Sequence, residues 1–231
     1  MQSINNKPKT VKDQIRQIIK KPKEKFLTFS QKEYWEILEK NQITLCFGPA
    51  GTGKSHISIK KAIDLLYCED NKYEKLIIIR SPIESSKSIG YLPGDIEEKM
   101  APYINPTYYL LNKIIGKESR ELMEKVNLIE IIPISFLRGR NIDNSIVIGE
   151  EFQNVGIDEM KLVLTRIGYN SKFFLSGDIE QSDLFKDKNK IGLFDAKERL
   201  RGIKDIGFFE FNKNDIVRNP IISEILERYN N

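Results

Sequence analysis

Histidine and cysteine are scarce in this chain of 231 residues, and long apolar runs are missing. The one histidine, His56, cannot build a histidine-based metal site, and two cysteines, Cys46 and Cys68, form neither a CxxC pair nor a disulfide framework. No apolar run approaches the roughly 20 residues of a membrane span, and the N-terminus lacks the apolar core of a signal peptide. These absences favour a protein of the reducing cytoplasm that has no contact with a membrane.

The net charge of +4 is concentrated near the N-terminus. Residues 1–25 contain eight basic and two acidic residues, a net charge of +6, so residues 26–231 together carry −2. This basic arm could contact nucleic acid or remain a solvated tail. Part of it could form a short amphipathic helix, because four apolar residues have helical spacing (Val11, Ile15, Ile18 and Ile19). We therefore expect an arm over 1–25 and one domain over 26–231.

Continuous apolar runs alternate with helical patterns along this domain. Strands are predicted at 43–47, 75–80, 127–132, 145–149, 172–176 and 207–211. Helices are predicted at 54–67, 157–168, 191–201 and 220–229, with short helical stretches up to about 125 that are interrupted at Pro102 and Pro106. Buried strands separated by helices indicate parallel βαβ units with both sheet faces covered. The sequence thus predicts a three-layer α/β sandwich whose ligands bind at the carboxyl ends of the strands.

A phosphate-binding loop follows the first predicted strand in the stretch "CFGPAGTGKS" (46–55). Gly48, Gly53, Lys54 and Ser55 satisfy the pattern G-x-x-x-x-G-K-[ST], and the whole loop comprises Gly48, Pro49, Ala50, Gly51, Thr52, Gly53, Lys54 and Ser55. The backbone N–H groups of such a loop converge on phosphate, Lys54 reaches the β- and γ-phosphates, and Ser55 offers its hydroxyl to Mg²⁺. The loop predicts binding of ATP with Mg²⁺.

Polar residues follow two other predicted strands. Glu150 and Glu151 come after "SIVIG", where a P-loop ATPase needs one acid for the Mg²⁺ shell and often a second for the attacking water. We assign Glu150 to the metal and Glu151 to water activation. Gln181 follows "KFFLSGD" and could sense the γ-phosphate or position water. Each could instead be an ordinary loop residue.

These motifs together resemble the PhoH-like proteins, phosphate-starvation-type P-loop ATPases related to the motor domains of superfamily 1 helicases. The resemblance covers about 28–229 and includes "GPAGTGKS", "GYLPGDIEEKMAPYINP", "FLRGRNI", "VIGEEFQN", "SGDIEQSDL" and "NDIVRNPII". It implies a RecA-like fold, and it implies that Gln31 in "TFSQKEYWEIL" reads adenine, although Gln31 could simply be a polar residue at a helix start. The family usually has Asp-Glu where this chain has Glu150 and Glu151, so slow hydrolysis is a real alternative.

The resemblance also implies that ATP hydrolysis drives or gates binding of RNA or single-stranded DNA, a helicase-like function. Strand contact would come from Arg138, Arg140, Lys87 and Tyr91, although the arginines could pair with acids instead. The alternatives are a non-catalytic ATP-gated binding module and a P-loop small-molecule kinase. One RecA-like domain lacks the arginine of a second, so we expect a homo-oligomeric ring, a hexamer, with Arg218 or Arg166 as the finger in trans. The Lys-, Ile- and Asn-rich composition is a weak indication of an AT-rich genome such as that of a phage.

Overall fold

A single six-stranded sheet forms the centre of the molecule. The computed structural model describes residues 21–68, 72–80, 96–182 and 186–217, together with positions 13, 16, 221 and 228. The strands are β1 (Ile43–Phe47), β2 (Lys75–Arg80), β3 (Ile129–Pro133), β4 (Ser145–Glu150), β5 (Lys172–Gly177) and β6 (Ile206–Glu210). Their order is β3-β2-β4-β5-β1-β6, and every neighbouring pair is parallel. All six strands coincide with the predicted apolar runs to within two residues at either end.

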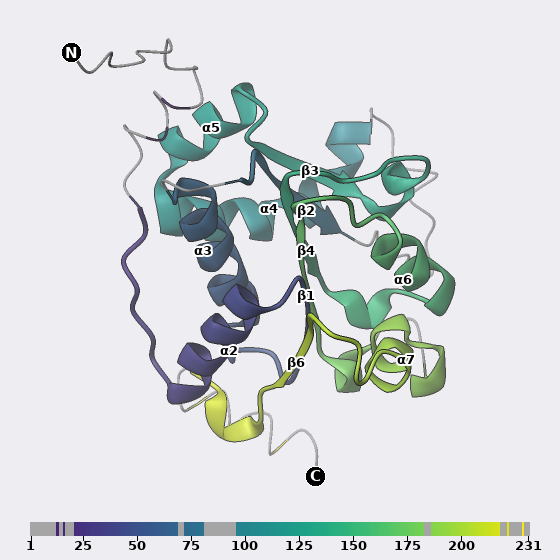
Figure 1. Ribbon diagram of the computed structural model, residues 1–231. Helices are drawn as coiled ribbons and strands as arrows, with labels where there is room; N and C mark the ends of the chain where they lie inside the picture. Colours follow the sequence, from purple (N-terminus) through teal and green to yellow (C-terminus); the bar gives the residue numbers. More distant parts are fainter. Residues whose placement is uncertain are drawn as a thin grey trace, which may run out of the picture.

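Helices cover both faces of this sheet (Figure 1). On one face lie α2 (Phe29–Lys40), α3 (Lys54–Tyr67), α5 (Lys117–Lys125) and the later turns of α4 (Ile96–Ile115), and on the other lie α6 (Ile157–Leu164) and α7 (Gly192–Arg199). Each face has its own apolar core, because strand residues alternate between the two sides: Leu76 and Ile78 pack with α3, whereas Ile77 and Ile79 pack in the core of α6 and α7. The predicted three-layer α/β fold of the RecA-like P-loop type is confirmed.

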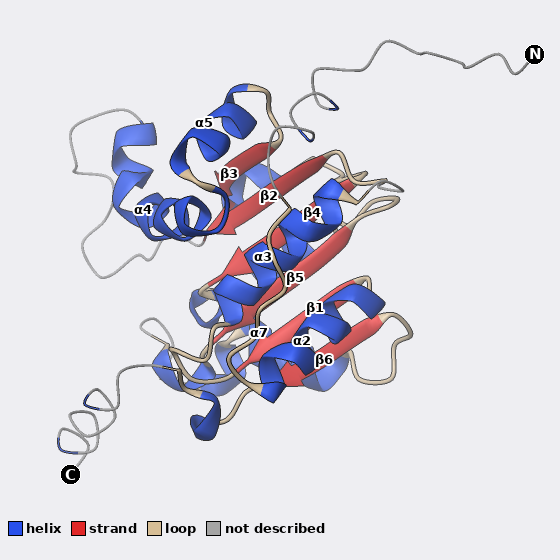
Figure 2. Ribbon diagram, turned by 90° about the vertical axis from the view of Figure 1, so that its left-hand side faces the viewer, coloured by secondary structure: helices blue, strands red, loops and turns tan. Residues whose placement is uncertain are grey.

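The strand order decides which loops meet. Parallel strands place all their carboxyl ends at one edge of the sheet (Figure 2). The P-loop follows β1, Glu150 and Glu151 follow the body of β4, and the 3₁₀ helix η4 (Ile179–Gln181) follows β5. Since β5 lies between β1 and β4, the loop after β5 sits between the P-loop and the two glutamates.

Two helical predictions differ from the structure. The region up to 125 is not a series of short stretches, since α4 runs without a break through positions 102 and 106. Pro106 is exposed, and the hydrogen bond that it cannot donate would have gone to the carbonyl oxygen of residue 102. Helix α6 ends at Leu164 and not near 168, because the chain turns at Thr165 and Arg166 to enter the isolated bridge between Ile142 and Ile167. The predicted helix over 220–229 lies almost wholly outside the described residues.

Short 3₁₀ helices complete the described chain: η2 (Ile134–Leu137), η3 (Phe152–Asn154), η5 (Lys188–Lys190) and η6 (Lys213–Asp215). Near the N-terminus, Arg16 donates to the carbonyl oxygen of Tyr73 at 3.0 Å, and Lys21 forms an ion pair with Asp64 of α3 at 2.8 Å. This part of the basic arm therefore contacts the domain. Among the described helices, none combines the length and the apolar character that crossing a membrane requires.

Candidate functional site

The P-loop adopts a backbone that only glycine tolerates easily. Gly51 and Gly53 have φ angles of +91° and +92°, in the left-handed region. A Cβ on Gly48 would lie 2.6 Å from the carbonyl oxygen of Phe211, so the residue that follows β6 packs directly against the loop entry. Lys54 begins α3, and its Nζ donates to the carbonyl oxygens of Gly48 at 2.6 Å and Pro49 at 2.9 Å. The cation thus crosses the loop at the positive end of a 14-residue helix, which favours bound anions.

Buried polar contacts hold the loop from outside. The side-chain amide of Gln31, 3% exposed, donates to the carbonyl oxygen of Thr52 at 3.0 Å and accepts from the backbone N–H of Leu27 at 2.9 Å. Asp178 Oδ2 accepts from the backbone N–H of Ala50 at 3.1 Å. The structure thus places Gln31 against the P-loop backbone with both ends of its amide engaged. Its role in reading adenine stays a prediction.

A cavity of about 580 Å³ lies beside the loop at the carboxyl edge of the sheet. Six of its lining residues carry the chemistry: Lys54, Ser55, Glu151, Gln153, Asp178 and Gln181. They come from the P-loop with the start of α3, from the turn after β4 and from the end of β5 with η4. The structure therefore brings together seven site residues that were predicted from sequence, namely Ala50, Gly51, Gly53, Lys54, Ser55, Glu151 and Gln181.

Glu151 is held in an uncommon conformation. Its φ and ψ are 58° and 35°, in the left-handed region that residues other than glycine seldom adopt. Gln153 Nε2 donates to Glu151 Oε2 at 2.7 Å, and Gln153 Oε1 accepts from the backbone N–H of Asp178 at 3.1 Å. Backbone strain of this kind persists where the surroundings fix it, and such sites are often functional. Sequence reasoning assigned no role to Gln153 or Asp178, although they lie in the motifs "VIGEEFQN" and "SGDIEQSDL" that span the carboxyl ends of β4 and β5.

Glu150 has different surroundings. It is 2% exposed, and its Oε2 lies 2.9 Å from Arg80 Nη2 and accepts from Thr107 Oγ1 at 2.9 Å. It is not among the residues that line the cavity, whereas Glu151 is. The two neighbouring carboxylates thus lie in different environments: Glu150 is buried beside Arg80, and Glu151 lines the cavity.

The oxygen donors of this site fit Mg²⁺. Magnesium prefers oxygen ligands and keeps several waters, so it is usually held by one or two protein groups plus substrate phosphates. Ser55 on the cavity wall supplies one such oxygen, and the carboxylates of Glu151 and Asp178 line the same cavity. Within the described ranges, no group of three or more histidine, cysteine, aspartate or glutamate residues could form a protein-only metal cage.

Helix α4 and the only histidine complete the cavity wall. Tyr109 and Leu110 of α4 line the cavity together with His56, the second residue after Lys54. Burial, together with the charges of Lys60 and Lys113, lowers the pKa of His56, which favours a neutral imidazole. The imidazole therefore adds no charge near neutral pH to a cavity whose charged lining residues are Lys54, Glu151 and Asp178.

The predicted arginines lie elsewhere or outside the description. Arg166 contacts the amino-terminal edge of the sheet, where its carbonyl oxygen accepts from Ile142 N at 2.9 Å. Arg140 pairs with Glu130 at 3.2 Å, as the structural alternative expected, and Arg138 is exposed. Arg218, Lys87 and Tyr91 fall outside the described residues.

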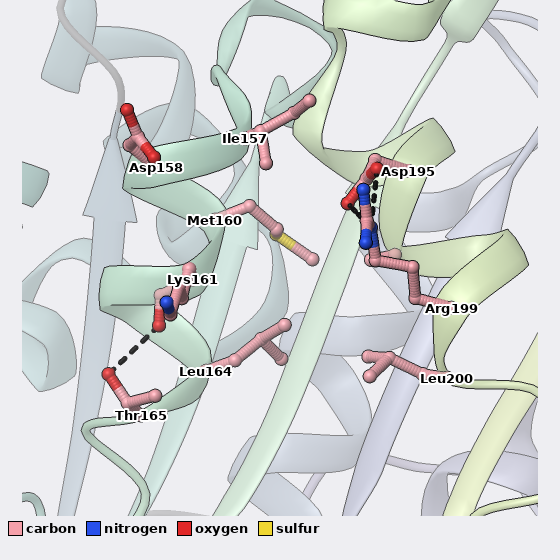
Figure 3. Close-up of a pocket in the computed structure, with 10 residues that line it drawn as sticks. Ile157, Asp158, Met160, Lys161, Leu164, Thr165, Asp195, Arg199 and Leu200 are labelled. Carbon is pink, nitrogen blue, oxygen red and sulfur yellow. Dashed lines mark hydrogen bonds and ion pairs between the residues drawn. The ribbon is translucent and has the colours of Figure 1, made fainter.

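A second cavity, of about 470 Å³, lies between α6 and α7 (Figure 3). Its walls include Ile157, Met160, Leu164 and Leu200, and the charged pair at its rim, Asp195 and Arg199, is joined at 2.7 Å. Its other polar lining residues, Asp158, Lys161 and Thr165, all belong to α6 or the residue after it, and the cavity has no phosphate-binding loop. The cavity beside the P-loop remains the candidate.

Comparison with known proteins agrees with this geometry. The family model described as "PhoH-like protein" matches residues 24–230. Similar proteins include the "PhoH-like protein" of Bacillus subtilis, 39% identical over 202 residues, and that of Synechocystis sp., 37% identical over 203 residues; each alignment covers 87% of this chain and 62% and 61% of the relative, respectively. "Protein PhoH" of Escherichia coli is 36% identical over 202 residues, covering 87% of this chain and 56% of the relative.

This chain therefore spans about three fifths of the length of the curated relatives it matches. The predicted resemblance is confirmed, both by the family match over nearly the whole chain and by the P-loop site at the carboxyl edge of a parallel sheet. The chain belongs to the PhoH-like family of P-loop proteins.

Proposed function

We propose that this chain is a Mg²⁺-dependent ATP hydrolase whose nucleotide cycle is coupled to binding of RNA or single-stranded DNA. The observation that carries the proposal is the shared cavity: Lys54 and Ser55 of the P-loop and the carboxylate of Glu151 line one space of about 580 Å³. A phosphate cradle without an acid would bind nucleotide, and a nearby carboxylate adds the means to activate water.

Each candidate site residue has a defined part in this proposal. The P-loop N–H groups and Lys54 would bind and orient the β- and γ-phosphates, and Ser55 with Glu150 would hold Mg²⁺, which supplies charge neutralisation when bound. Glu151 would orient the attacking water and accept its proton, with Gln153 fixing the carboxylate at 2.7 Å. Gln181, which lines the same cavity, would contact the γ-phosphate or the water.

Coupling to a polynucleotide rests on the family resemblance and on exposed basic residues. Arg138 is exposed, and the side chain of Arg140 is 42% exposed although it is paired with Glu130.

Phosphate release in the presence and absence of polynucleotide tests the proposal. Wild-type protein should hydrolyse ATP with Mg²⁺, and homopolymeric RNA or single-stranded DNA should increase the rate. Lys54→Ala serves as the control for contaminating ATPases. Release that is equal in wild-type and Lys54→Ala protein would overturn the hydrolase assignment, and a rate that neither polymer changes would overturn the coupling.

One observation favours a second function, an ATP-gated binding module without turnover. Glu150 is 2% exposed and does not line the cavity, so its carboxylate is less accessible to a metal than that of Glu151. Such a module would bind ATP and change its affinity for a polynucleotide without releasing phosphate. Equilibrium binding of labelled RNA with ATP, measured beside phosphate release, separates the two functions.

A further inference from the structure

Arg80, Thr107 and Glu150 form a closed, buried hydrogen-bonded triangle. Arg80 Nη2 donates to Glu150 Oε2 at 2.9 Å, Thr107 Oγ1 donates to the same oxygen at 2.9 Å, and Arg80 Nε and Nη2 donate to Thr107 Oγ1 at 3.0 and 2.6 Å. The side chain of Arg80 is 12% exposed, Glu150 is 2% exposed and Thr107 is fully buried. The three residues come from β2, α4 and β4, and Arg80 and Glu150 are register partners at the ends of adjacent parallel strands.

The triangle fixes one oxygen of the carboxylate. Among the described residues, both hydrogen bonds that Glu150 accepts end on Oε2. Two hydrogen bonds to the same oxygen prevent rotation of the carboxylate, and they therefore fix the direction in which Oε1 points. The positive charge of Arg80 also offsets the cost of burying an ionised acid. A glutamate side chain is one bond longer than aspartate and has an additional rotatable bond, so its carboxylate needs such an anchor more than aspartate does.

We propose that Arg80 and Thr107 are positioning residues that hold Glu150 for the Mg²⁺ shell. This inference rests on the proposed function, in which Glu150 serves the metal. Arg80 supplies the balancing charge, and Thr107 supplies the hydroxyl that directs the carboxylate. Neither residue lines the nucleotide cavity, and neither does Glu150, whose contact with the metal would run through water. In this proposal Arg80 and Thr107 therefore act only through Glu150.

Helix α4 links Thr107 to the wall of the nucleotide cavity. The same helix places Tyr109 and Leu110 on the cavity wall, two and three residues further on. A shift of α4 on nucleotide binding would therefore move the hydroxyl that orients Glu150. The Mg²⁺ affinity of the complex should depend on α4 although α4 contributes no metal ligand in this proposal.

The test measures the Mg²⁺ dependence of nucleotide binding, without turnover. An ATP analogue with a fluorescent ribose label is titrated against Mg²⁺ in wild-type, Thr107→Val, Thr107→Ser and Arg80→Lys proteins. Thr107→Val removes the hydroxyl with little change in shape, and the Mg²⁺ midpoint should rise about tenfold, as expected for loss of one hydrogen bond to a charged group. Thr107→Ser keeps the hydroxyl and should restore a midpoint close to that of the wild type. Arg80→Lys keeps the charge without the planar fork, and its midpoint should rise.

Thr44→Val is the matched control. Thr44 of β1 is fully buried, as Thr107 is, but its Oγ1 has no hydrogen-bond partner within the part of the chain that the structure describes. Its replacement should leave the Mg²⁺ midpoint unchanged. Urea unfolding of every variant separates loss of fold from loss of positioning, and if Thr107→Val does not fold, Arg80→Lys carries the same test.

The outcomes distinguish this inference from the proposed function. A Mg²⁺ midpoint in folded Thr107→Val and Arg80→Lys proteins equal to that of the wild type would overturn the positioning role alone. A wild-type protein that binds the analogue with no dependence on Mg²⁺ would overturn the metal assignment and the inference together. In a double-mutant cycle, Thr107→Val should change the midpoint much less once Glu150→Gln is present; equal changes in both backgrounds would mean that Thr107 does not act through Glu150.

Discussion

Gln153 joins Glu151 to the end of the neighbouring strand through its two amide atoms. Nε2 donates to Glu151 Oε2 at 2.7 Å, and Oε1 accepts from the backbone N–H of Asp178 at 3.1 Å. A Cβ at Gly177 would lie 2.7 Å from Gln153 Oε1, so the glycine makes room for this bridge. The position of the carboxylate that we assign to water activation is therefore set relative to the same aspartate that contacts the P-loop.

Gln153→Leu should reduce turnover with little effect on nucleotide affinity. The substitution keeps a similar size but removes the donor to Glu151 and leaves the N–H of Asp178 without its partner, which costs about 1–3 kcal/mol of stability. We expect kcat for phosphate release to fall roughly tenfold to a hundredfold, because general-base catalysis contributes about that much or more. Gln42→Leu, at an exposed position just before β1, is the control. A variant with normal kcat would show that Gln153 does not position Glu151.

Lys54→Ala should abolish tight ATP binding. The ammonium lies across the loop, 2.6 Å from the carbonyl oxygen of Gly48, and its charge-assisted contact with the β- and γ-phosphates is worth about 1.5–3 kcal/mol. Affinity should therefore fall by at least tenfold, as measured by calorimetry with Mg²⁺ and ATP. Unchanged affinity and turnover would contradict the P-loop interpretation.

Glu151→Gln should separate binding from hydrolysis. The amide keeps the size of the side chain but cannot accept the proton of an attacking water. Because Lys54 and Ser55 are untouched, ATP should bind with about wild-type affinity while single-turnover phosphate release stops. If this variant hydrolyses ATP normally, the assignment of Glu151 is wrong and another acid activates the water.

The sequence predicted where the strands and the P-loop lie along the chain better than it predicted which distant residues contact one another. The six strands and the P-loop were predictable because buried parallel strands are short apolar runs, and because the loop requires fixed residues at fixed spacing. The partners of Glu150 were not, since Arg80 lies 70 residues away and Thr107 lies 43 residues away, in a segment where Pro102 and Pro106 argued against a long helix. Likewise nothing local showed that the amide of Gln31 packs against Thr52.

Buried Lys172 should make stability depend on pH in the alkaline range. Its Nζ donates to three carbonyl oxygens at the end of α2, those of Leu38, Glu39 and Asn41. Burial, aided by the charges of Lys61 and Lys72, lowers the pKa of Lys172 to about 8. Between pH 8 and 10.5, the ordinary pKa of lysine, the unfolded chain keeps a proton that the folded chain has lost, so stability rises with pH across this window.

Urea unfolding of wild-type and Lys172→Met proteins at pH 7.5, 9 and 10.5 measures this effect. The difference in unfolding free energy between the two should move in favour of the wild type as pH rises. The change should be at most about 3 kcal/mol, and smaller if the three carbonyl acceptors favour the ammonium form. Lys40→Met is the control, because Lys40 is an exposed lysine in the last turn of α2. A difference that stays constant over this range would contradict the lowered pKa.

The last prediction concerns assembly. Hydrolysis requires a cation against the charge that develops on the γ-phosphate, and an arginine supplied in trans can be worth about 10³–10⁵ in rate. Arg166 lies at the amino-terminal edge of the sheet, opposite the P-loop, so it could serve only the site of another subunit. Arg218, the other candidate, lies outside the described residues. A head-to-tail contact that brings either arginine to a neighbouring P-loop would close into a ring when the rotation permits, and we propose a hexamer.

Mixing two inactive variants tests whether the finger acts in trans. Lys54→Ala subunits lack a working P-loop but keep Arg218, whereas Arg218→Ala subunits keep the P-loop but lack the arginine. In mixed rings, some interfaces combine an intact P-loop with an intact arginine, so ATP hydrolysis should partly recover. The same experiment with Arg166→Ala identifies which arginine acts, because only the variant of the true finger is inactive alone and recovers on mixing. Light scattering that shows a monomer with full ATPase activity at the assay concentration would rule out the ring and both fingers in trans, whatever the fate of the P-loop assignment.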